Sequence, residues 1–367
     1  MIDKIMSFFI PFITIFIPKN KKKWVFSSWG GSRLADSPKA FQEWIVNNSK
    51  DVRCIWIVKN KSLVCQEKGV FYYKSIWGLW HQATAKIVFV THSINSDLYR
   101  PVIAHNTLRV QMWHGAALKK IGFDDTVFNK HNAVSRTRIY RYLSNEYYSI
   151  ILSLGPLCSK DFQSAFGVDD SRLLEVGFPR NDIMLKEPKK HDDLIIYLPT
   201  FRGKPGESID ILQDAAFDLV SLDEKLAKAG LTLIVRLHPV NKLPDYYTNT
   251  TNIIFDNDVE LYDLLARARA LITDYSSVMF DFAATGKPIL FLAHDLSEYL
   301  NNDREMYFDY HELGAEHIFG SWNEIASEFE SLGAHKDNAF LKSYHATYHK
   351  SSSRSLYEYL ANKIRIN

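Results

Sequence analysis

Short apolar runs rich in β-branched and aromatic residues alternate with amphipathic windows from Trp24 onward, and this alternation constrains the fold more than any other feature. Strands without polar alternation are typical of parallel sheets that helices cover on both faces. The runs predict strands at Trp24–Ser28, Arg53–Val58, Ile87–Thr91, Val110–Trp113, Ile150–Leu154, Leu173–Val176, Leu194–Leu198, Leu231–Arg236, Ile253–Phe255, Ala270–Thr273 and Ile289–Leu292. The windows predict helices that include Pro38–Asn48, Ser159–Phe166, Asp210–Ala229, Leu261–Arg267 and Val278–Thr285. The sequence therefore predicts an α/β fold.

The length of the chain and one break in the alternation predict two domains. The chain has 367 residues, whereas single cores stop growing near ~250–300 residues. The break falls at Lys186–Asp193, a charged stretch with a proline and no periodicity, which is typical of a linker. We therefore expect an N-terminal domain over residues 24–187 and a C-terminal domain over residues 188–367, with substrates in the cleft between them.

Residues 1–23 form a third region, because an almost wholly apolar run from Ile5 to Ile17 is followed by four lysines. The run is interrupted by Pro11 and is shorter than the ~20 residues of a spanning helix. A secretory signal would carry its positive charge before the apolar run. The order found here favours a segment that lies in the lipid interface and attaches the protein peripherally to a membrane surface. The alternative is a first helix buried on its own domain.

Composition and missing motifs exclude several classes of protein. A hydrophobic content of 46% and a charged content of 23% are ordinary for a globular protein, and a net charge of +2 gives no general attraction to nucleic acid. The sequence contains neither a GxxxxGK[ST] phosphate loop nor a GxGxxG fingerprint, so neither ATP nor NAD is indicated. The sequence contains no HExxH motif and no CxxC pair that would suggest a metal site. We expect no obligate cofactor, and a Mg²⁺ held loosely on a diphosphate is compatible with this expectation.

Polar residues follow predicted strands of the first half, where an α/β fold collects its functional groups. His114 lies between a strand end and Gly115, and a histidine there could accept a proton because its ordinary pKa is near neutral. Lys119 comes five residues later, and its alternative role is that of a solvated surface charge. Arg180 follows a rigid Gly-x-Pro turn and could hold a phosphate through its planar guanidinium. A core histidine bonded to backbone and a salt bridge between domains are the alternatives for His114 and Arg180.

The second half repeats this pattern, with charged or hydroxyl side chains close behind strands at Arg202, Arg236, His238, Asp274, Ser276 and Ser277. Ser276 and Ser277 precede the predicted helix at Val278. Hydroxyls and backbone N–H groups at a helix start can bind an anion, and serine also caps helices without any ligand. Taken together, these residues predict a diphosphate-binding site with a base nearby.

The same residues resemble the CDP-glycerol glycerophosphotransferase family, whose members synthesise teichoic acids and capsular polymers. The resemblance rests on WGGSRLADSPKAF, QMWHGAALKKIGFD, GFPRND, YLPTFRG, RLHP and LITDYSSVMFDFAATGKPILFLAHDLSEY, which cover nearly the whole chain. The sequence departs from the family pattern at Ala116-Ala117 and Leu313-Gly314, where Thr-Pro and Pro-Gly are more usual. These departures fall in the acceptor-side turn and in the last donor-side loop.

The resemblance implies two facing Rossmann-like domains, as in GT-B glycosyltransferases, with the donor held by the C-terminal domain. It implies that His114 is the acceptor-activating base, and His238 is the second candidate for that role. His238 and Arg202 would bind the donor diphosphate and Ser276 and Ser277 a phosphate. Asp274 would position its loop or meet the donor.

The implied reaction transfers glycerol phosphate or ribitol phosphate from a CDP-alditol to a hydroxyl of a lipid-linked saccharide or growing polymer, with release of CMP. Such chemistry is mostly positioning and charge neutralisation, which cationic side chains and helix-end amides can supply. The expected location is the cytoplasmic face of the cell membrane. The alternatives are a nucleotide-sugar glycosyltransferase of the same fold and a membrane-docked scaffold without turnover.

Overall fold

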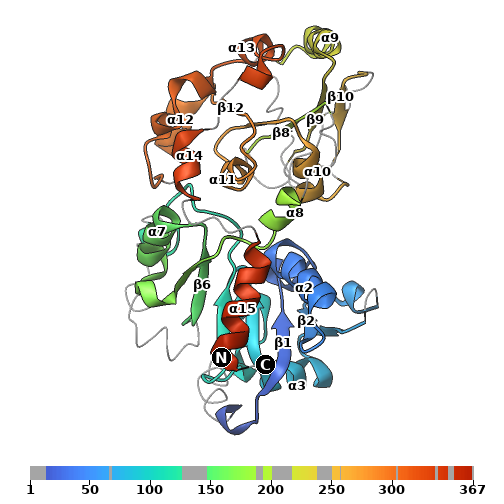
Figure 1. The fold of residues 1–367 in the computed structure, drawn as a ribbon, viewed down its shortest axis with the longest axis vertical. Helices are drawn as coiled ribbons and strands as arrows, with labels where there is room; N and C mark the ends of the chain where they lie inside the picture. The colour runs from blue at the N-terminus through green and yellow to red at the C-terminus, as the bar shows by residue number, and fades with distance from the viewer. Residues whose placement is uncertain are drawn as a thin grey trace. The chain divides into compact units, whose positions relative to one another are not determined.

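The structure is a computed structural model, and it describes residues 14–65, 68–125, 147–186, 193–200, 217–237, 250–256, 258–302, 305–334, 338–345 and 351–365 (Figure 1). By its internal contacts the chain forms two compact units. Unit 1 comprises residues 1–114, 121–182 and 347–367, and unit 2 comprises residues 115–120 and 183–346.

Unit 1 is built on a seven-stranded, all-parallel sheet in the order β3-β2-β1-β4-β5-β6-β7. Its central strands are continuous apolar runs, and Trp24, Val25 and Phe26 are fully buried. The strands are β1 Asn20–Phe26, β2 Arg53–Val58, β3 Val70–Tyr72, β4 Ala85–Val90, β5 Leu108–Gln111, β6 Ile150–Ser153 and β7 Leu173–Glu175. The helices are α2 Asp36–Asn48, α3 Ile76–Thr84, α4 Ile94–Asp97, α7 Pro156–Phe166 and α15 Ser352–Ile364, with α8 Asn181–Leu185 crossing from unit 1 into unit 2.

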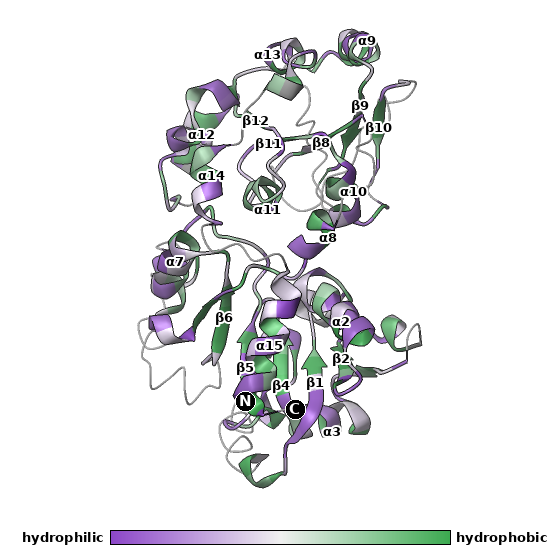
Figure 2. Ribbon diagram, viewed as in Figure 1, coloured by the Kyte–Doolittle hydropathy of each residue, from purple (hydrophilic) through white to green (hydrophobic). Residues whose placement is uncertain are grey.

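Unit 2 contains a six-stranded, all-parallel sheet in the order β10-β9-β8-β11-β12-β13. Its strands are also apolar, as their green colour in Figure 2 shows, and Leu233 and Ile272 are fully buried in the core. The strands are β8 Leu194–Leu198, β9 Thr232–Val235, β10 Ile253–Phe255, β11 Ala270–Thr273, β12 Ile289–Leu292 and β13 Ile318–Phe319. The helices are α9 Leu219–Ala229, α10 Leu261–Arg267, α11 Val278–Ala283, α12 Leu296–Asn302, α13 Trp322–Ser327 and α14 Ala339–Ser343.

Both sheets have the strand order of a doubly wound fold. Within each sheet the chain first adds strands on one side of the starting strand and then continues on the other side. The reversal lies between β1 and β4 in unit 1, and between β8 and β11 in unit 2. Folds of this kind bind ligands outside the carboxyl ends of the strands at that reversal. The fold therefore directs attention to the loops after these four strands.

The predicted α/β fold with parallel sheets is confirmed, and every predicted strand occurs with small shifts at its ends. The short strands β3 and β13 were not predicted. The predicted helix at Asp210–Ala229 begins at Leu219, and its first residues up to 216 lie outside the described part of the chain. None of the described helices is long and apolar enough to span a membrane.

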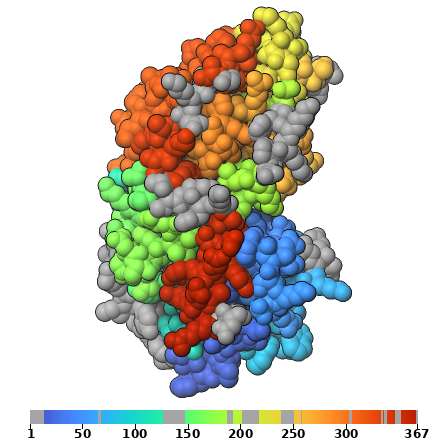
Figure 3. Space-filling model, viewed as in Figure 1, coloured from blue at the N-terminus to red at the C-terminus, as the bar shows by residue number. Residues whose placement is uncertain are grey.

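The sequence predicted one boundary near residue 187, but residues 347–367 return to unit 1. The returning helix α15 packs on α2 and β1, where the Tyr357 hydroxyl lies 2.7 Å from Ser49 Oγ and the Tyr357 ring lies 5.9 Å from that of Trp24. Figure 3 shows α15 in red beside the blue surface of α2. Its packing partners are distant in sequence, so no local pattern could reveal this return.

Asp182 fixes the first turn of α15. Its carboxylate accepts hydrogen bonds from Ser352 N at 2.7 Å, Ser353 N at 2.8 Å and Ser351 Oγ at 3.0 Å. A carboxylate at this position satisfies backbone donors that have no partner inside the helix, and it interacts favourably with the helix dipole. Asp182 belongs to the GFPRND motif, so this part of the motif is explained by helix attachment.

We expect Asp182→Ala to loosen α15 from unit 1, because it removes three hydrogen bonds from the first turn. The loss should be about 1–2 kcal/mol, as for a lost helix cap. Hydrogen–deuterium exchange should become faster in peptides from Ser352–Ile364. Glu358→Ala on the same helix is the control, since its exposed pair with Arg354 is worth little. Unchanged exchange in Asp182→Ala would contradict the attachment role.

Candidate active site

His114 lies in the tight turn that follows β5 in unit 1. Trp113 before it has φ 52° and Gly115 after it has φ 136°, so the residues on both sides of His114 have positive φ angles. Such angles are uncommon for a residue with a side chain, and the strain at Trp113 is an observation in favour of a functional turn.

The main chain determines which nitrogen of His114 carries the proton. Nδ1 lies 3.1 Å from the carbonyl oxygen of Thr91, the first residue after β4. A carbonyl oxygen can only accept a hydrogen bond, so Nδ1 is the protonated nitrogen. In the neutral ring, Nε2 is then the proton acceptor. This tautomer suits a general base that acts through Nε2.

Aromatic rings from three strand ends surround His114. The ring of His92, after β4, stacks on it with centroids 4.7 Å apart. The ring of Trp113 stacks at 4.2 Å, and the ring of Trp29, after β1, lies at 6.2 Å. The cluster lies at the β1–β4 reversal and the adjoining strand end, where the fold predicts a ligand site.

Trp29 and His92 were not among the sequence candidates. Both follow predicted strands, and that position was the signal that could have identified them. Asp97 was also missed, although its fully buried carboxylate connects the loops after β1 and β4. It accepts hydrogen bonds from Gly30 N at 2.8 Å, Thr91 N at 2.7 Å and His92 N at 3.0 Å. Asp97 therefore fixes Thr91, whose carbonyl oxygen orients His114.

Burial lowers the pKa of His114 to about 4, and the neighbouring His92 and Arg180 add smaller effects in the same direction. The hydrogen bond with Thr91 and the charge of Asp36 act the other way. The sequence predicted an ordinary pKa near neutrality for His114, and this prediction is wrong because the ring is desolvated. The imidazole stays neutral at physiological pH and can accept a proton.

Arg180 forms an ion pair with Asp36, with 2.9 Å between Nη1 and Oδ1. The two side chains are only 5% and 4% exposed. Asp36 has φ 66° at the start of α2, so the backbone is strained where its carboxylate meets the guanidinium. Both residues belong to unit 1, whereas the alternative considered from the sequence was a bridge between domains. The predicted contact of Arg180 with a donor stays a prediction.

Asp274 connects the loops at the β8–β11 reversal of unit 2. Its carboxylate accepts hydrogen bonds from the backbone N–H of Thr200, with N–O distances of 2.8 and 3.0 Å, and from the Thr200 hydroxyl. Thr200 follows β8 and is the last described residue before the segment that contains Arg202. This geometry supports the loop-positioning role, one of the two that the family resemblance implied for Asp274.

Tyr275 and Tyr299 form a buried aromatic stack beside Asp274. Their ring centroids are 3.8 Å apart, and the Tyr275 hydroxyl donates to Asp295 Oδ1 at 2.8 Å. Burial, followed by the charge of Asp295, raises the pKa of Tyr275 well above its usual range. The ammonium of Lys119 lies 4.6 Å from the centroid of the Tyr299 ring. The DYSS motif and Lys119 are therefore brought together inside unit 2.

Lys119 reaches this place because residues 115–120 belong to unit 2, although they follow a strand of unit 1. Lys119 pairs with Met306 as an isolated antiparallel bridge, and Lys120 N donates to the carbonyl oxygen of Glu305 at 2.7 Å. The sequence motif that contains His114 and Lys119 is thus divided between the two units.

The remaining candidates of unit 2 follow β9 and β11. Arg236 lies after β9, and its Nη1 donates to the carbonyl oxygen of Val259. Ser277 is the N-cap residue of α11 but makes no side-chain cap hydrogen bond, and Ser276 is half-buried beside it. Arg202 and His238 lie outside the described residues, so their predicted roles stay predictions.

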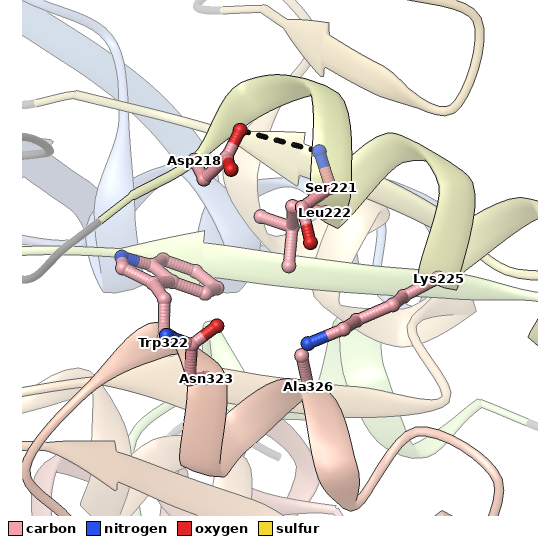
Figure 4. Close-up of a pocket in the computed structure, with 7 residues that line it drawn as sticks. All are labelled: Asp218, Ser221, Leu222, Lys225, Trp322, Asn323 and Ala326. Carbon is pink, nitrogen blue, oxygen red and sulfur yellow. Dashed lines mark hydrogen bonds between the residues drawn. The ribbon is translucent and has the colours of Figure 1, made fainter.

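A pocket in unit 2 lies away from these residues, between α9 and α13 (Figure 4). Its lining is Asp218, Ser221, Leu222, Lys225, Trp322, Asn323 and Ala326, which includes none of the predicted site residues. Among the residues that the structure describes, no group of three or more His, Cys, Asp or Glu side chains is arranged as metal ligands. The expectation about metals stays a prediction.

Solved structures identify the class of fold. The chain is similar to the structure of the wall teichoic acid polymerase TagF, with a TM-score of 0.76 and 23% identity over 99% of this chain and 93% of that chain. A His-to-Asn variant of TagF soaked with CDPG matches with a TM-score of 0.76 and 22% identity, covering 98% of this chain and 94% of that chain. The fold is therefore that of a GT-B-like polymerase with two parallel-sheet units.

The chain belongs to the CDP-Glycerol:Poly(glycerophosphate) glycerophosphotransferase family, whose model matches residues 9–360. It is 29% identical to a teichoic acid glycerol-phosphate transferase of Staphylococcus aureus, over 79% of each chain. It is 28% identical to a teichoic acid poly(glycerol phosphate) polymerase of Bacillus spizizenii, over 90% of this chain and 88% of the relative. The family resemblance is thereby confirmed, and the protein is an enzyme of the phosphotransferase type.

We expect the ring of His114 to remain neutral far below the ordinary histidine pKa of ~6.5, because burial disfavours its charged form. In ¹⁵N-labelled protein, the His114 nitrogen shifts should therefore stay constant from pH 8 to pH 5, with Nδ1 as the protonated nitrogen. His114→Gln assigns the signals by their disappearance, and denatured protein supplies the reference titration. A titration midpoint of His114 near pH ~6.5 in the folded protein would contradict the desolvation of its ring.

Proposed function

We propose that this protein transfers glycerol phosphate from CDP-glycerol to a hydroxyl group of a cell-surface polymer or its lipid-linked saccharide, and releases CMP. The observation that carries the proposal is the match of the family model to residues 9–360. The names of several relatives, among them a glycerol-phosphate primase of Bacillus subtilis that is 32% identical over 52% of this chain, support glycerol as the alditol.

The reaction is a substitution at the phosphorus atom that bears the glycerol. The acceptor oxygen forms a new bond to this phosphorus, and the bond from phosphorus to the bridging oxygen of CMP breaks. The hydroxyl proton passes to the base, and the electron pair of the broken bond leaves with CMP. Cations and N–H donors around the phosphate oxygens stabilise the charge that develops there.

His114 is the base in this proposal. Its Nδ1 is engaged by the Thr91 carbonyl, so Nε2 is the nitrogen that accepts the hydroxyl proton. Burial keeps the ring neutral before the reaction. The stacked His92 and Trp113 hold the plane of the ring. His114 gains a positive charge in a desolvated place, and the carboxylate of Asp36 favours that charge.

Unit 2 supplies the donor ligands in this proposal. Arg202 and His238 bind the diphosphate, with Arg236 and Lys119 as further cations, and Ser276 and Ser277 bind phosphate oxygen atoms. Asp274 acts through Thr200, because its carboxylate fixes the start of the segment that carries Arg202. Arg180 acts indirectly in this proposal, because its ion pair holds the carboxylate of Asp36 in place. The donor needs no obligate metal, since these cations neutralise its charge, and a loosely held Mg²⁺ is compatible with the scheme.

The enzyme works at the cytoplasmic face of the cell membrane in this proposal, attached peripherally. The supporting feature is the apolar run Ile5–Ile17 followed by lysines, of which Lys21 and Lys22 are exposed, whereas Lys23 is buried and Lys19 donates to backbone carbonyl oxygens. Apolar side chains that enter the lipid boundary and lysines that meet anionic headgroups bind a membrane together. A lipid-linked acceptor would then be held at the same surface.

We expect His114→Ala to lower turnover about 10²–10⁴-fold with donor binding retained, because the donor ligands belong to unit 2. CMP release from CDP-glycerol with a lipid-linked saccharide acceptor is the measurement. In the wild type, turnover should fall only as pH approaches about 4, because a base is active above its pKa and lost as pH falls through it. Near wild-type turnover in His114→Ala would move the role to His238. Release of UDP from UDP-sugars with no CMP from CDP-glycerol would overturn the proposed reaction.

We expect Ser277→Ala to weaken CDP-glycerol binding by roughly 10–150-fold, because one hydrogen bond to a charged oxygen is worth about 1.5–3 kcal/mol. Isothermal titration calorimetry gives the affinity, and thermal unfolding checks that the fold is intact. Ser327→Ala is the matched control, because its hydroxyl bonds only to the carbonyl of Glu324 on the surface of α13. Equal affinity of wild type, Ser277→Ala and Arg202→Ala would contradict the donor assignment to unit 2.

A further inference from the structure

Helix α3 of unit 1 is amphipathic, but its apolar side faces solvent and its polar side is buried. It exposes its large apolar side chains, since Ile76 is 83%, Trp77 64% and Trp80 52% exposed. Its buried residues include His81, Gln82 and Thr84. Ile76 and Trp77 lie four and three residues before Trp80, so the three side chains share one face of the helix. A helix of a globular protein normally buries its apolar side chains, so this exposed face needs an explanation.

The buried polar side of α3 is firmly bonded, which fixes the outward direction of the apolar face. Gln82 Nε2 donates to the carbonyl oxygens of Tyr73 at 2.8 Å and Gly78 at 3.0 Å, and Gln82 Oε1 accepts from Tyr99 N at 2.8 Å. Rotating the helix to bury the tryptophans would break these bonds in a buried place, which is costly. The exposure is therefore built into the fold.

A second exposed apolar element adjoins α3 at the start of β1. The residues Thr14–Phe16 form a short 3₁₀ helix whose Phe16 is 85% exposed. Asn20 pairs with Ala85, the first residue after α3, and Lys19 donates to the carbonyl oxygen of Ala83. Figures 1 and 3 show this segment and α3 at the same end of unit 1. We call Phe16, Ile76, Trp77 and Trp80 the aromatic face.

Basic side chains lie at the amino ends of β1 and β2, next to the aromatic face. Lys23 Nζ lies 5.8 Å from the Trp80 ring centroid. Lys21 and Lys22 before it are exposed, and exposed Arg53 pairs with Lys23 across the sheet. Lys22 has an ion pair with Asp51 at 3.1 Å. We call Lys21, Lys22 and Arg53 the basic rim. Its net charge is positive, so it complements an anionic partner.

We propose that the aromatic face and the basic rim dock unit 1 on an anionic lipid bilayer. Tryptophan is enriched at membrane interfaces because its ring is apolar and its N–H is polar, and lysines are attracted by acidic headgroups. The surface lies at the amino ends of the parallel strands, whereas His114 follows a carboxyl end, so docking leaves the base on the opposite edge of the sheet. The docking uses described residues in addition to the segment 5–17, and it does not depend on the proposed reaction.

The test is co-sedimentation of the full chain with vesicles of phosphatidylcholine alone or mixed with phosphatidylglycerol. Trp77→Ala/Trp80→Ala should lower the partition coefficient on mixed vesicles by about tenfold or more. Lys21→Glu/Lys22→Glu should do the same on mixed vesicles, since both interactions with acidic headgroups reverse sign. The controls are Val46→Ala/Val220→Ala, at exposed apolar positions of α2 and α9, and Lys225→Glu/Lys228→Glu, which makes the same charge change in unit 2.

Tryptophan fluorescence shows whether the aromatic face itself enters the lipid. Brominated phosphatidylcholine in the mixed vesicles should quench the tryptophan fluorescence of the wild-type protein. The variant Trp77→Phe/Trp80→Phe should lose most of this quenching while it still binds the vesicles.

Phe8→Ser/Phe9→Ser, in the apolar run, should weaken vesicle binding further when combined with Trp77→Ala/Trp80→Ala. Turnover of CDP-glycerol with a detergent-solubilised acceptor should be unchanged in Trp77→Ala/Trp80→Ala, so loss of docking and loss of chemistry are distinguished.

Three outcomes would overturn the docking surface. The first is unchanged vesicle binding by folded Trp77→Ala/Trp80→Ala, with Phe8→Ser/Phe9→Ser alone abolishing it. The second is a dimer in sedimentation velocity that this tryptophan variant dissociates without any change in vesicle binding, which would show that a second copy covers the face. The third is equal loss of binding in the controls, which would show a non-specific effect of charge or apolar area.

Discussion

In each unit a buried carboxylate joins the loops that follow the two central strands of the sheet, and the candidate site depends on these two interactions. Asp97 accepts hydrogen bonds from the loops after β1 and β4. Asp274 follows β11 and accepts from Thr200 after β8. Parallel strands end at one edge of a sheet and leave backbone N–H groups there without ladder partners. A carboxylate satisfies several of these donors at once and holds both loops in one geometry.

Each carboxylate acts on the proposed chemistry through another residue. Asp97 holds Thr91, and the Thr91 carbonyl selects the tautomer of His114. Asp274 holds Thr200, and the chain continues from there to Arg202. A carboxylate that is used for backbone bonds is less available to contact a substrate. Residues of the same type in the same kind of loop can therefore be structural, and only the hydrogen bonds distinguish them from ligands.

The sequence predicted the sheets well because each central strand is a continuous apolar run, which is a local signal. It identified His114 and Asp274 because both follow such runs. It missed His92, Trp29 and Asp97, since their roles arise from contacts between separate loops. It also assigned His114 an ordinary pKa, because desolvation depends on side chains that the local sequence does not name. The return of α15 and the place of Lys119 in unit 2 likewise rest on long-range packing.

The buried histidine and the exposed tryptophans of unit 1 follow from one property of parallel sheets, which is that their two edges differ. At the carboxyl edge, loops converge and bury polar groups, so the pKa of His114 falls and the ring stays neutral. At the amino edge, α3 ends and β4 begins, and the polar side of α3 is bonded inward through Gln82. The apolar side of α3 is then left to solvent or to a partner. The two edges of the sheet therefore carry surfaces of different kinds, a desolvated polar one around His114 and an exposed apolar one on α3.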